Sequence, residues 1–185
     1  IVSNLSLHWV NDLPGALAQI RGTLKGDGLF LAAFLGAGTL VELRECLTAA
    51  EIEVHGGAGP RLSPLPTLGD SAALLQRARF ALPVVDSDTL TVTYTDAFKL
   101  MADLRCMGEG NSVIARRKTF TGRAVLQRAV ELYHERFERP DGLLPVTFQI
   151  IYLHGWAPHE SQPNALEPGS ATIRLADFLD TNEQS

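Results

Sequence analysis

The chain has 185 residues, of which 45% are hydrophobic and 20% are charged, and its net charge at pH 7 is -5. This composition is typical of a globular protein, and the length favours a single domain. The negative net charge argues against nucleic acid as the main partner, because binding a phosphate backbone requires a basic surface. No run of about 18 apolar residues occurs, so neither a transmembrane helix nor a signal peptide is expected.

Residues 1–35 predict a strand, a helix and a second strand. Asn11 or Asp12 can cap the helix, and apolar residues recur behind them at helical spacing. The unbroken apolar run at 29–35 is typical of a strand that is covered on both faces of a parallel sheet. The stretch therefore predicts a βαβ unit, whose crossover is expected to be right-handed.

Further helices and strands are predicted downstream of residue 35. Helices are expected at 39–55, 67–78, 96–108 and 121–137, and strands at 82–85, 89–94 and 144–153, of which the first two can be one bent strand. Thr39 with Glu42, and Thr67 with Asp70, have the spacing of a capping box.

The composition changes after residue 156. Residues 157–169 are rich in Pro, Gln, Asn and Ser and predict a linker, and 173–179 predict a short amphipathic helix. The chain is therefore divided into a folded body at 1–156 and a linker with a tail at 157–185.

Neither the cysteines nor the histidines indicate a metal site. Cys46 and Cys106 are far apart and lack metal-ligand spacing, so free thiols in a reducing compartment are expected. The five histidines are dispersed, and no site of two histidines and one carboxylate for iron is visible. No metal ligand is assigned.

Several segments carry a family resemblance when they are taken in order: residues 1–14, 20–28, 86–94, 100–108 and 145–156. They resemble the S-adenosylmethionine-dependent methyltransferases with the doubly wound fold. Within that superfamily they are most similar to the branch of the biotin-pathway malonyl carrier-protein methyltransferase and the methyltransferase-like assembly factor of respiratory complex I. The later segments are closer to the assembly factor.

The resemblance implies an α/β, Rossmann-like methyltransferase fold that is truncated at its N-terminal side. It implies a mostly parallel sheet that ends in an antiparallel strand pair, with the helices at 96–108 and 121–137 inserted between those two strands near the substrate. Because residue 1 is Ile and lies within a strand pattern, the chain is expected to be part of a longer protein, whose Gly-rich cofactor loop lies upstream. An unpaired edge at the first strand predicts a homodimer or aggregation of the isolated segment.

Candidate cofactor and catalytic residues follow the first strand. The resemblance implies that Asn4, Leu5 and Ser6 flank the methionine part of S-adenosylmethionine. Trp9 can offer a π face to a cation, or it can pack in the core. His8 is the candidate general base or substrate contact, with a purely structural histidine as the alternative.

Candidate substrate contacts come from later segments. Arg61, in the Pro-rich loop 58–66, can bind a carboxylate or phosphate through two hydrogen bonds, or it can be an ordinary exposed loop residue. Tyr152 can face the pocket from the end of the last strand, or it can pack in the core. Arg116 and Arg117 can dock an acidic carrier protein, with a solvated loop as the alternative.

The sequence therefore predicts the C-terminal, substrate-side portion of an S-adenosylmethionine-dependent methyltransferase, with an undetermined methyl acceptor. The alternative is a non-methylating assembly factor of respiratory complex I that binds protein or hydroxylates arginine. The full-length protein is expected to bind the cofactor, and this segment is expected to bind it weakly or not at all and to be inactive. Expected partners are a small-molecule or protein acceptor, including an acidic carrier protein or a complex I subunit, in the bacterial cytoplasm or the mitochondrial matrix.

Overall fold

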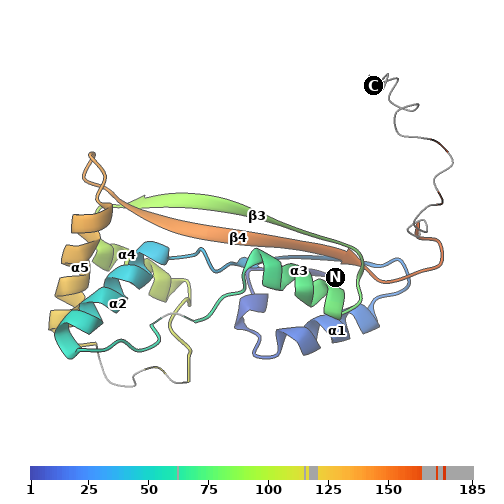
Figure 1. Ribbon diagram of the computed structural model, residues 1–185, viewed down its shortest axis with the longest axis horizontal. Coiled ribbons are helices and arrows are strands. Elements are labelled where there is room, and N and C mark those ends of the chain that lie inside the picture. The colour runs from blue at the N-terminus through green and yellow to red at the C-terminus, as the bar shows by residue number, and fades with distance from the viewer. Residues whose placement is uncertain (62, 115, 117–120, 164–169, 171–172, 174–185) are drawn as a thin grey trace, which may run out of the picture.

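The computed structural model describes residues 1–61, 63–114, 116, 121–163, 170 and 173. Within these residues, the helices lie along one side of a four-stranded sheet (Figure 1). The elements in chain order are β1 (Val2–Asn4), the 3-10 turn η1 (Leu7–Trp9), α1 (Leu13–Thr23), β2 (Leu29–Leu35), α2 (Val41–His55), α3 (Leu68–Arg77), β3 (Ala81–Tyr94), α4 (Ala97–Cys106), α5 (Arg123–Phe137) and β4 (Leu144–Trp156).

The strands lie side by side in the order β1-β2-β4-β3. β1 pairs with β2 in parallel, while β4 runs antiparallel to both β2 and β3. The predicted βαβ unit and the C-terminal antiparallel pair are thus confirmed, and α4 and α5 are inserted between β3 and β4 as expected. The α/β class is confirmed, with β1 and β2 as the parallel part of the sheet. The two strand segments predicted at 82–94 form the single strand β3.

Two helix N-termini are capped as the sequence predicts. The Asp12 carboxylate accepts a hydrogen bond from the backbone N–H of Gly15, over 2.9 Å, at the start of α1. At α3 the Thr67 hydroxyl accepts from the Asp70 backbone N–H, and the Asp70 carboxylate accepts from the Thr67 N–H, which completes the capping box. Both caps join groups that lie a few residues apart, so the sequence alone can predict them.

The capping box predicted at Thr39 and Glu42 is wrong. The N-cap of α2 is Leu40, which has a left-handed backbone with φ of 56°. The Thr39 hydroxyl instead donates to the carbonyl oxygen of Gln149 and accepts from its N–H, and the Glu42 carboxylate accepts from the N–H and hydroxyl of Thr147. Because β4 passes beside the start of α2, these polar groups join the helix to the strand.

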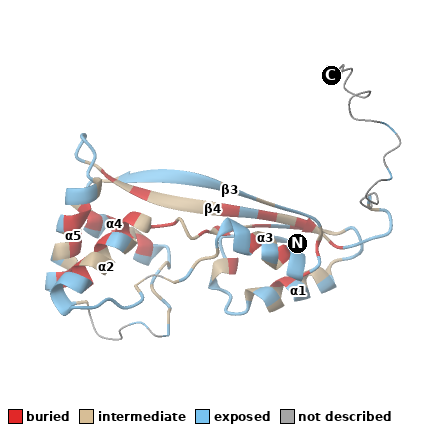
Figure 2. Ribbon diagram, in the orientation of Figure 1, coloured by how far each residue is buried: buried red, intermediate tan, exposed pale blue. Residues whose placement is uncertain are grey.

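Among the described residues, the apolar core consists of two clusters under the two halves of the paired strands β3 and β4 (Figure 2). Leu144 and Val146 of β4 belong to the cluster of α2, α4 and α5. Ile151 and Leu153 belong to the cluster that includes residues of α1, α3 and β2. The residues of β4 that pack against helices are thus even-numbered in its first half and odd-numbered in its second half. The twist of two long paired strands permits this change.

The expectation that residues 29–35 are covered on both faces is wrong. Phe30 and Phe34 are fully buried, but Leu31 is 40% exposed. On the same open side of the sheet, Val2 and Tyr152 are 76% and 43% exposed. The reason is that α1 to α5 all cover the other side of the sheet (Figure 1).

Backbone hydrogen bonds join the first residue after β4 to the turn between α1 and β2. The N–H of Ala157 donates to the oxygen of Gly28, and the N–H of Asp27 donates to the oxygen of Ala157. The helix predicted at 173–179 lies outside the described residues, apart from Ile173. No helix within the described part of the chain is long and apolar enough to span a membrane.

Candidate functional site

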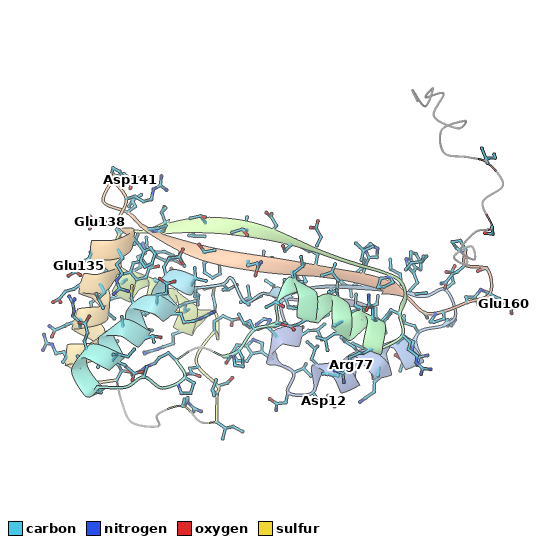
Figure 3. All side chains as sticks on the ribbon, viewed as in Figure 1. Asp12, Arg77, Glu135, Glu138, Asp141 and Glu160 are labelled. Atoms are coloured by element: carbon cyan, nitrogen blue, oxygen red, sulfur yellow. The ribbon has the colours of Figure 1, made fainter. Side chains whose placement is uncertain are left out.

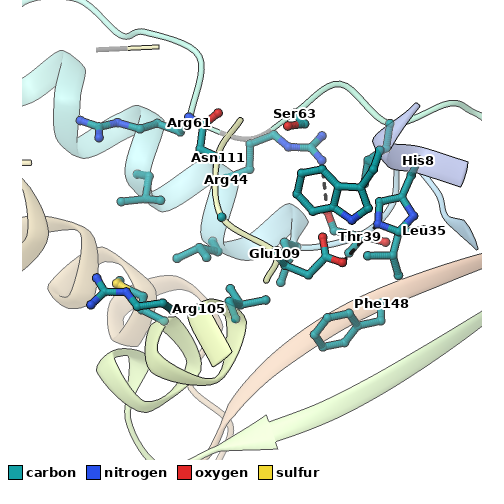
Figure 4. Close-up of a pocket in the computed structure, with 18 residues that line it drawn as sticks. His8, Leu35, Thr39, Arg44, Arg61, Ser63, Arg105, Glu109, Asn111 and Phe148 are labelled. Atoms are coloured by element: carbon teal, nitrogen blue, oxygen red, sulfur yellow. Dashed lines mark hydrogen bonds and ion pairs between the residues drawn. The ribbon is translucent and has the colours of Figure 1, made fainter. Parts of the chain in front are cut away.

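A cavity of about 260 Å³ lies between η1, the start of α2, α4 and the loops that follow α2 and α4 (Figure 4). Leucines, Met101 and Phe148 supply much of its wall. His8, Arg44, Arg61, Arg105, Glu109 and Asn111 bring polar groups to it. An apolar cavity with a few convergent polar groups is the usual form of a site for a small molecule or side chain.

His8 and Glu109 form a pair at this cavity, although they lie 101 residues apart in the sequence. The distance from His8 Nε2 to Glu109 Oε1 is 3.2 Å, and the two side chains are 2% and 22% exposed. Leu7 is buried within η1, and this anchors the short turn that carries His8. Glu109 lies three residues beyond the end of α4, and its backbone N–H donates to the carbonyl oxygen of Leu104 in that helix.

The second ring nitrogen of His8, Nδ1, is buried and has no hydrogen-bond partner among the described residues. A buried polar atom without a partner is costly, and such an atom calls for an explanation in terms of a ligand, a water or catalysis. If the Nε2 proton is donated to Glu109, Nδ1 carries the free lone pair. The carboxylate then fixes the tautomer and stabilises the imidazolium when Nδ1 takes a proton.

The three arginines that line the cavity differ in what they already bind. Arg44 donates through Nη2 to the carbonyl oxygens of Ala37 and Thr39, over 3.2 and 3.1 Å. Arg61 pairs with Glu51 and donates to the Thr121 hydroxyl. The Arg105 guanidinium has no hydrogen bond or ion pair with any described residue, whereas its backbone oxygen accepts from the Gly108 N–H.

Arg61 was the arginine predicted to bind an anion, and it does line the cavity. Its guanidinium is already engaged by a carboxylate, so Arg44 and Arg105 are the cations better placed to meet a ligand. Neither of these two, nor Glu109, was singled out from the sequence. Each lies in or just after an ordinary amphipathic helix, and no local motif marks it.

The residues predicted at the end of β1 do not all reach this cavity. His8 and Trp9 line it, and their ring centroids are 5.4 Å apart. Asn4 and Tyr152 instead line a shallow groove on the open side of the sheet. The sequence-predicted site is therefore split between the two sides of the sheet.

Leu5 and Ser6 connect these two places. Leu5 has a left-handed backbone with φ of 46°, and its N–H donates to the oxygen of Ala33. The Ser6 hydroxyl lies 3.0 Å from that of Ser3, and both Asn4 and Ser6 are exposed. Exposed polar atoms at the carboxyl end of a parallel strand fit a polar ligand, because open α/β sheets bind ligands there.

The other predicted contacts lie away from the cavity or cannot be placed. Arg116 is exposed and donates to the carbonyl oxygen of Val113 in its own loop. Arg117 lies outside the described residues. Among residues 1–61, 63–114 and 121–163, no cluster of three or more His, Cys, Asp and Glu side chains is arranged to hold a metal ion.

No family model matches the chain. It is similar to the protein named arginine-hydroxylase NDUFAF5, mitochondrial, in Dictyostelium discoideum, with 44% identity over 98% of this chain and 42% of the relative. The human protein of the same name is 46% identical over 96% of this chain and 51% of the relative. The malonyl-[acyl-carrier protein] O-methyltransferase of Xylella fastidiosa is 38% identical over 90% and 54%.

The chain spans about half the length of the curated relatives it matches. Among solved structures, a putative methyltransferase from Bacillus halodurans matches 85% of this chain and 68% of its own, with 14% identity and a TM-score of 0.49.

Proposed function

We propose that the chain is the substrate-side portion of an S-adenosylmethionine-binding enzyme. The support is its similarity, over at least 90% of its length, to the NDUFAF5 arginine hydroxylases and to a malonyl carrier-protein methyltransferase. The cavity at His8 is its substrate site. The observation that carries this proposal is the His8–Glu109 pair, with the free Nδ1 of a buried histidine at an apolar cavity.

The substrate group that fits the pair carries a proton at neutral pH. A carboxylate is already ionised and needs no base to attack a methyl group, whereas an amine or guanidinium must lose a proton. The Glu109 carboxylate can bind a guanidinium, and the face of Trp9, which is 39% exposed, can stack on it. We therefore propose that an arginine side chain of a protein enters the cavity, as the name of the more identical relatives suggests.

A malonyl thioester of a carrier protein is the second candidate substrate. Arg44 and Arg105 favour it, because both line the cavity and the guanidinium of Arg105 is not paired with any described residue. The exposed Arg116 is available to an acidic carrier protein. Methyl transfer to the malonyl carboxylate would use these cations for binding and orientation, and His8 would then have no proton to remove.

Asn4, the backbone of Leu5 and Ser6 are the residues proposed to contact the cofactor. S-adenosylmethionine supplies a methyl group on a sulfonium when it is bound. The residues of this chain contribute binding and alignment, the apolar wall excludes water from the cavity, and His8 Nδ1 holds or moves a proton. Correct alignment of the reacting groups supplies much of the catalysis in a displacement of this kind.

The proposed partner is a protein, either a respiratory complex I subunit or a carrier protein. The curated NDUFAF5 relatives are mitochondrial by name. The proposed compartment is therefore the mitochondrial matrix if the source is a eukaryote, and the cytoplasm if it is a bacterium.

Mass spectrometry of cells with and without the full-length gene distinguishes the two substrates. For an arginine substrate, an arginine peptide of complex I loses, when the gene is absent, the mass of one oxygen if it is hydroxylated, or of one methylene if it is methylated. Hydroxylation would also need dioxygen and an external reductant. For a malonyl methyltransferase, the malonyl carrier protein loses the mass of one methylene. Glu109→Gln is expected to imitate the deletion in the first case and Arg105→Gln in the second. The proposal fails if neither modification depends on the gene.

A further inference from the structure

Glu51 is a buried carboxylate that the proposed chemistry does not use. It lies near the end of α2 and is 2% exposed. Its Oε2 accepts a hydrogen bond of 3.0 Å from the backbone N–H of Gly59, and its Oε1 is paired with Arg61. Removing one partner of such a buried ion pair destabilises the fold, because the other charge stays buried without compensation.

These two partners of Glu51, Gly59 and Arg61, lie in the loop between α2 and α3, here called the first loop (residues 56–67). The first loop is joined to the segment between α4 and α5, here called the second loop (residues 107–122). Arg61 Nη1 donates to the Thr121 hydroxyl over 2.8 Å, and Asn111 Nδ2 donates to the Pro60 oxygen over 2.9 Å. The hydroxyls of Ser63 and Ser112 are 3.3 Å apart.

Both loops form walls of the cavity. Arg61 and Ser63 line it from the first loop, and Glu109 and Asn111 line it from the second. Glu109 is the partner of His8, so the position of the second loop decides whether the pair can form. Glu51 itself does not line the cavity.

We propose that Glu51 is a positioning residue, which fixes both loops through Arg61 and Gly59 and thereby holds Glu109 beside His8. Arg61 is the connecting group, because its planar guanidinium binds the Glu51 carboxylate and the Thr121 hydroxyl at the same time. The substrate site depends in this way on a carboxylate that does not itself line the cavity.

Hydrogen–deuterium exchange of the full-length protein tests this without substrate or cofactor, so it remains informative if the proposed function is wrong. Glu51→Gln weakens the bond to Arg61, and exchange is expected to become roughly tenfold faster in the described residues of both loops, including residues 109–114. Glu53→Gln is the matched control. Glu53 lies on the same helix but is exposed and pairs with Arg128, so exchange in the loops is expected to be unchanged.

Thr121→Val supplies a second variant that leaves the buried pair intact and therefore does not depend on whether Glu51→Gln folds. It removes the contact of Arg61 with the second loop, so exchange should quicken at 109–114 while the Gly59 amide keeps its protection. The proposal is overturned if Thr121→Val leaves the second loop unchanged, if Glu51→Gln affects the Gly59 region alone, or if Glu53→Gln has the same effect as Glu51→Gln.

The modification measured in cells connects this positioning to function. If the proposed function is right, Glu51→Gln lowers the extent of the substrate modification, and Glu53→Gln does not. Loosened loops with full modification would refute the role of Glu51 at the site. Loosened loops in a protein whose gene affects neither substrate would refute the proposed function and leave the positioning of Glu109 standing.

Discussion

At the scale of single residues, His8 has the features of a group that is kept for function. Its side chain is almost fully buried, and Nδ1 has no hydrogen-bond partner among the described residues. Leaving a buried polar atom unsatisfied costs about 1–3 kcal/mol of stability. Functional sites often carry such costs, and the rest of the fold compensates for them.

His8→Leu is therefore expected to raise the free energy of unfolding by about 1 kcal/mol, net of the lost pair with Glu109, while it abolishes the arginine modification. Urea unfolding of the full-length protein measures the first effect, and mass spectrometry the second. His134→Leu is the control, because His134 is 39% exposed and pairs with Glu138 at the surface. A large loss of stability in His8→Leu would instead make His8 a structural residue.

The two cysteines are expected to differ in their chemistry. Burial raises the pKa of the Cys46 thiol to about 11, whereas Cys106 is exposed. At neutral pH iodoacetamide should modify Cys106 quickly and Cys46 only after unfolding, because the thiolate is the nucleophile. Equal labelling rates in the folded protein would contradict the burial of Cys46.

The same pKa shift predicts a pH dependence of stability. The folded-state pKa of Cys46 is raised, so its contribution is present at pH values below the ordinary thiol pKa and is lost as the pH rises through about 11. The free energy of unfolding should therefore fall between about pH 9 and 11 through this group. Cys46→Ala should reduce that fall, and a pH dependence identical to that of the parent protein would count against it.

At the scale of elements, the sequence predicts what depends on neighbours along the chain. The caps at Asp12 and Thr67 are satisfied within a few residues, and both were predicted correctly. Thr39 has the same local spacing, but its hydroxyl bonds to Gln149 on β4, which lies 110 residues away. A capping motif cannot reveal that another strand competes for the same hydroxyl.

The candidate site follows the same rule. His8 and Trp9 were predicted because they belong to one short motif after a strand. Glu109, which completes the pair, lies 101 residues from His8, and only the packing of the loop after α4 brings the two together. Asn4 was grouped with His8 because the two are close in sequence, although they line different cavities.

The end of α3 allows a prediction that concerns backbone geometry alone. Arg79 follows the C-cap Ala78 and has a φ of 59°, while the N–H of Phe80 bonds to the oxygen of Leu75. Glycine is the preferred residue at such a left-handed position, so Arg79→Gly is expected to raise the free energy of unfolding by about 1 kcal/mol. Thermal and urea unfolding measure the change.

Arg77→Gly makes the same change in side chain two positions earlier, where the chain is still helical. It is expected to lower the free energy of unfolding by about 1 kcal/mol, because glycine is a poor residue within a helix. Opposite signs for the two substitutions would support the backbone explanation. Changes of the same sign would show that the arginine side chains decide the outcome.

At the scale of the whole molecule, one side of the sheet is covered by helices and the other is open (Figures 1 and 3). Val2, Leu31, Val84 and Tyr152 are all more than one-third exposed, and they line one groove on the open side. β3 adds an edge strand on which Leu90 and Val92 are 47% and 42% exposed. Apolar sheet faces and free strand edges promote association between chains.

The isolated 185-residue chain is therefore expected to self-associate through this open side. Leu31→Lys and Val84→Lys place charges in the groove and should shift the chain toward monomer in multi-angle light scattering. Ile52→Lys is the control, because Ile52 is 53% exposed on α2, on the helical side of the sheet. In the full-length protein the same groove substitutions should change the mass little if further segments of that protein cover the sheet. Hydrophobic association strengthens with the amount of exposed apolar surface, so the unsubstituted 185-residue chain should associate. A chain that is monomeric at high concentration would contradict the prediction.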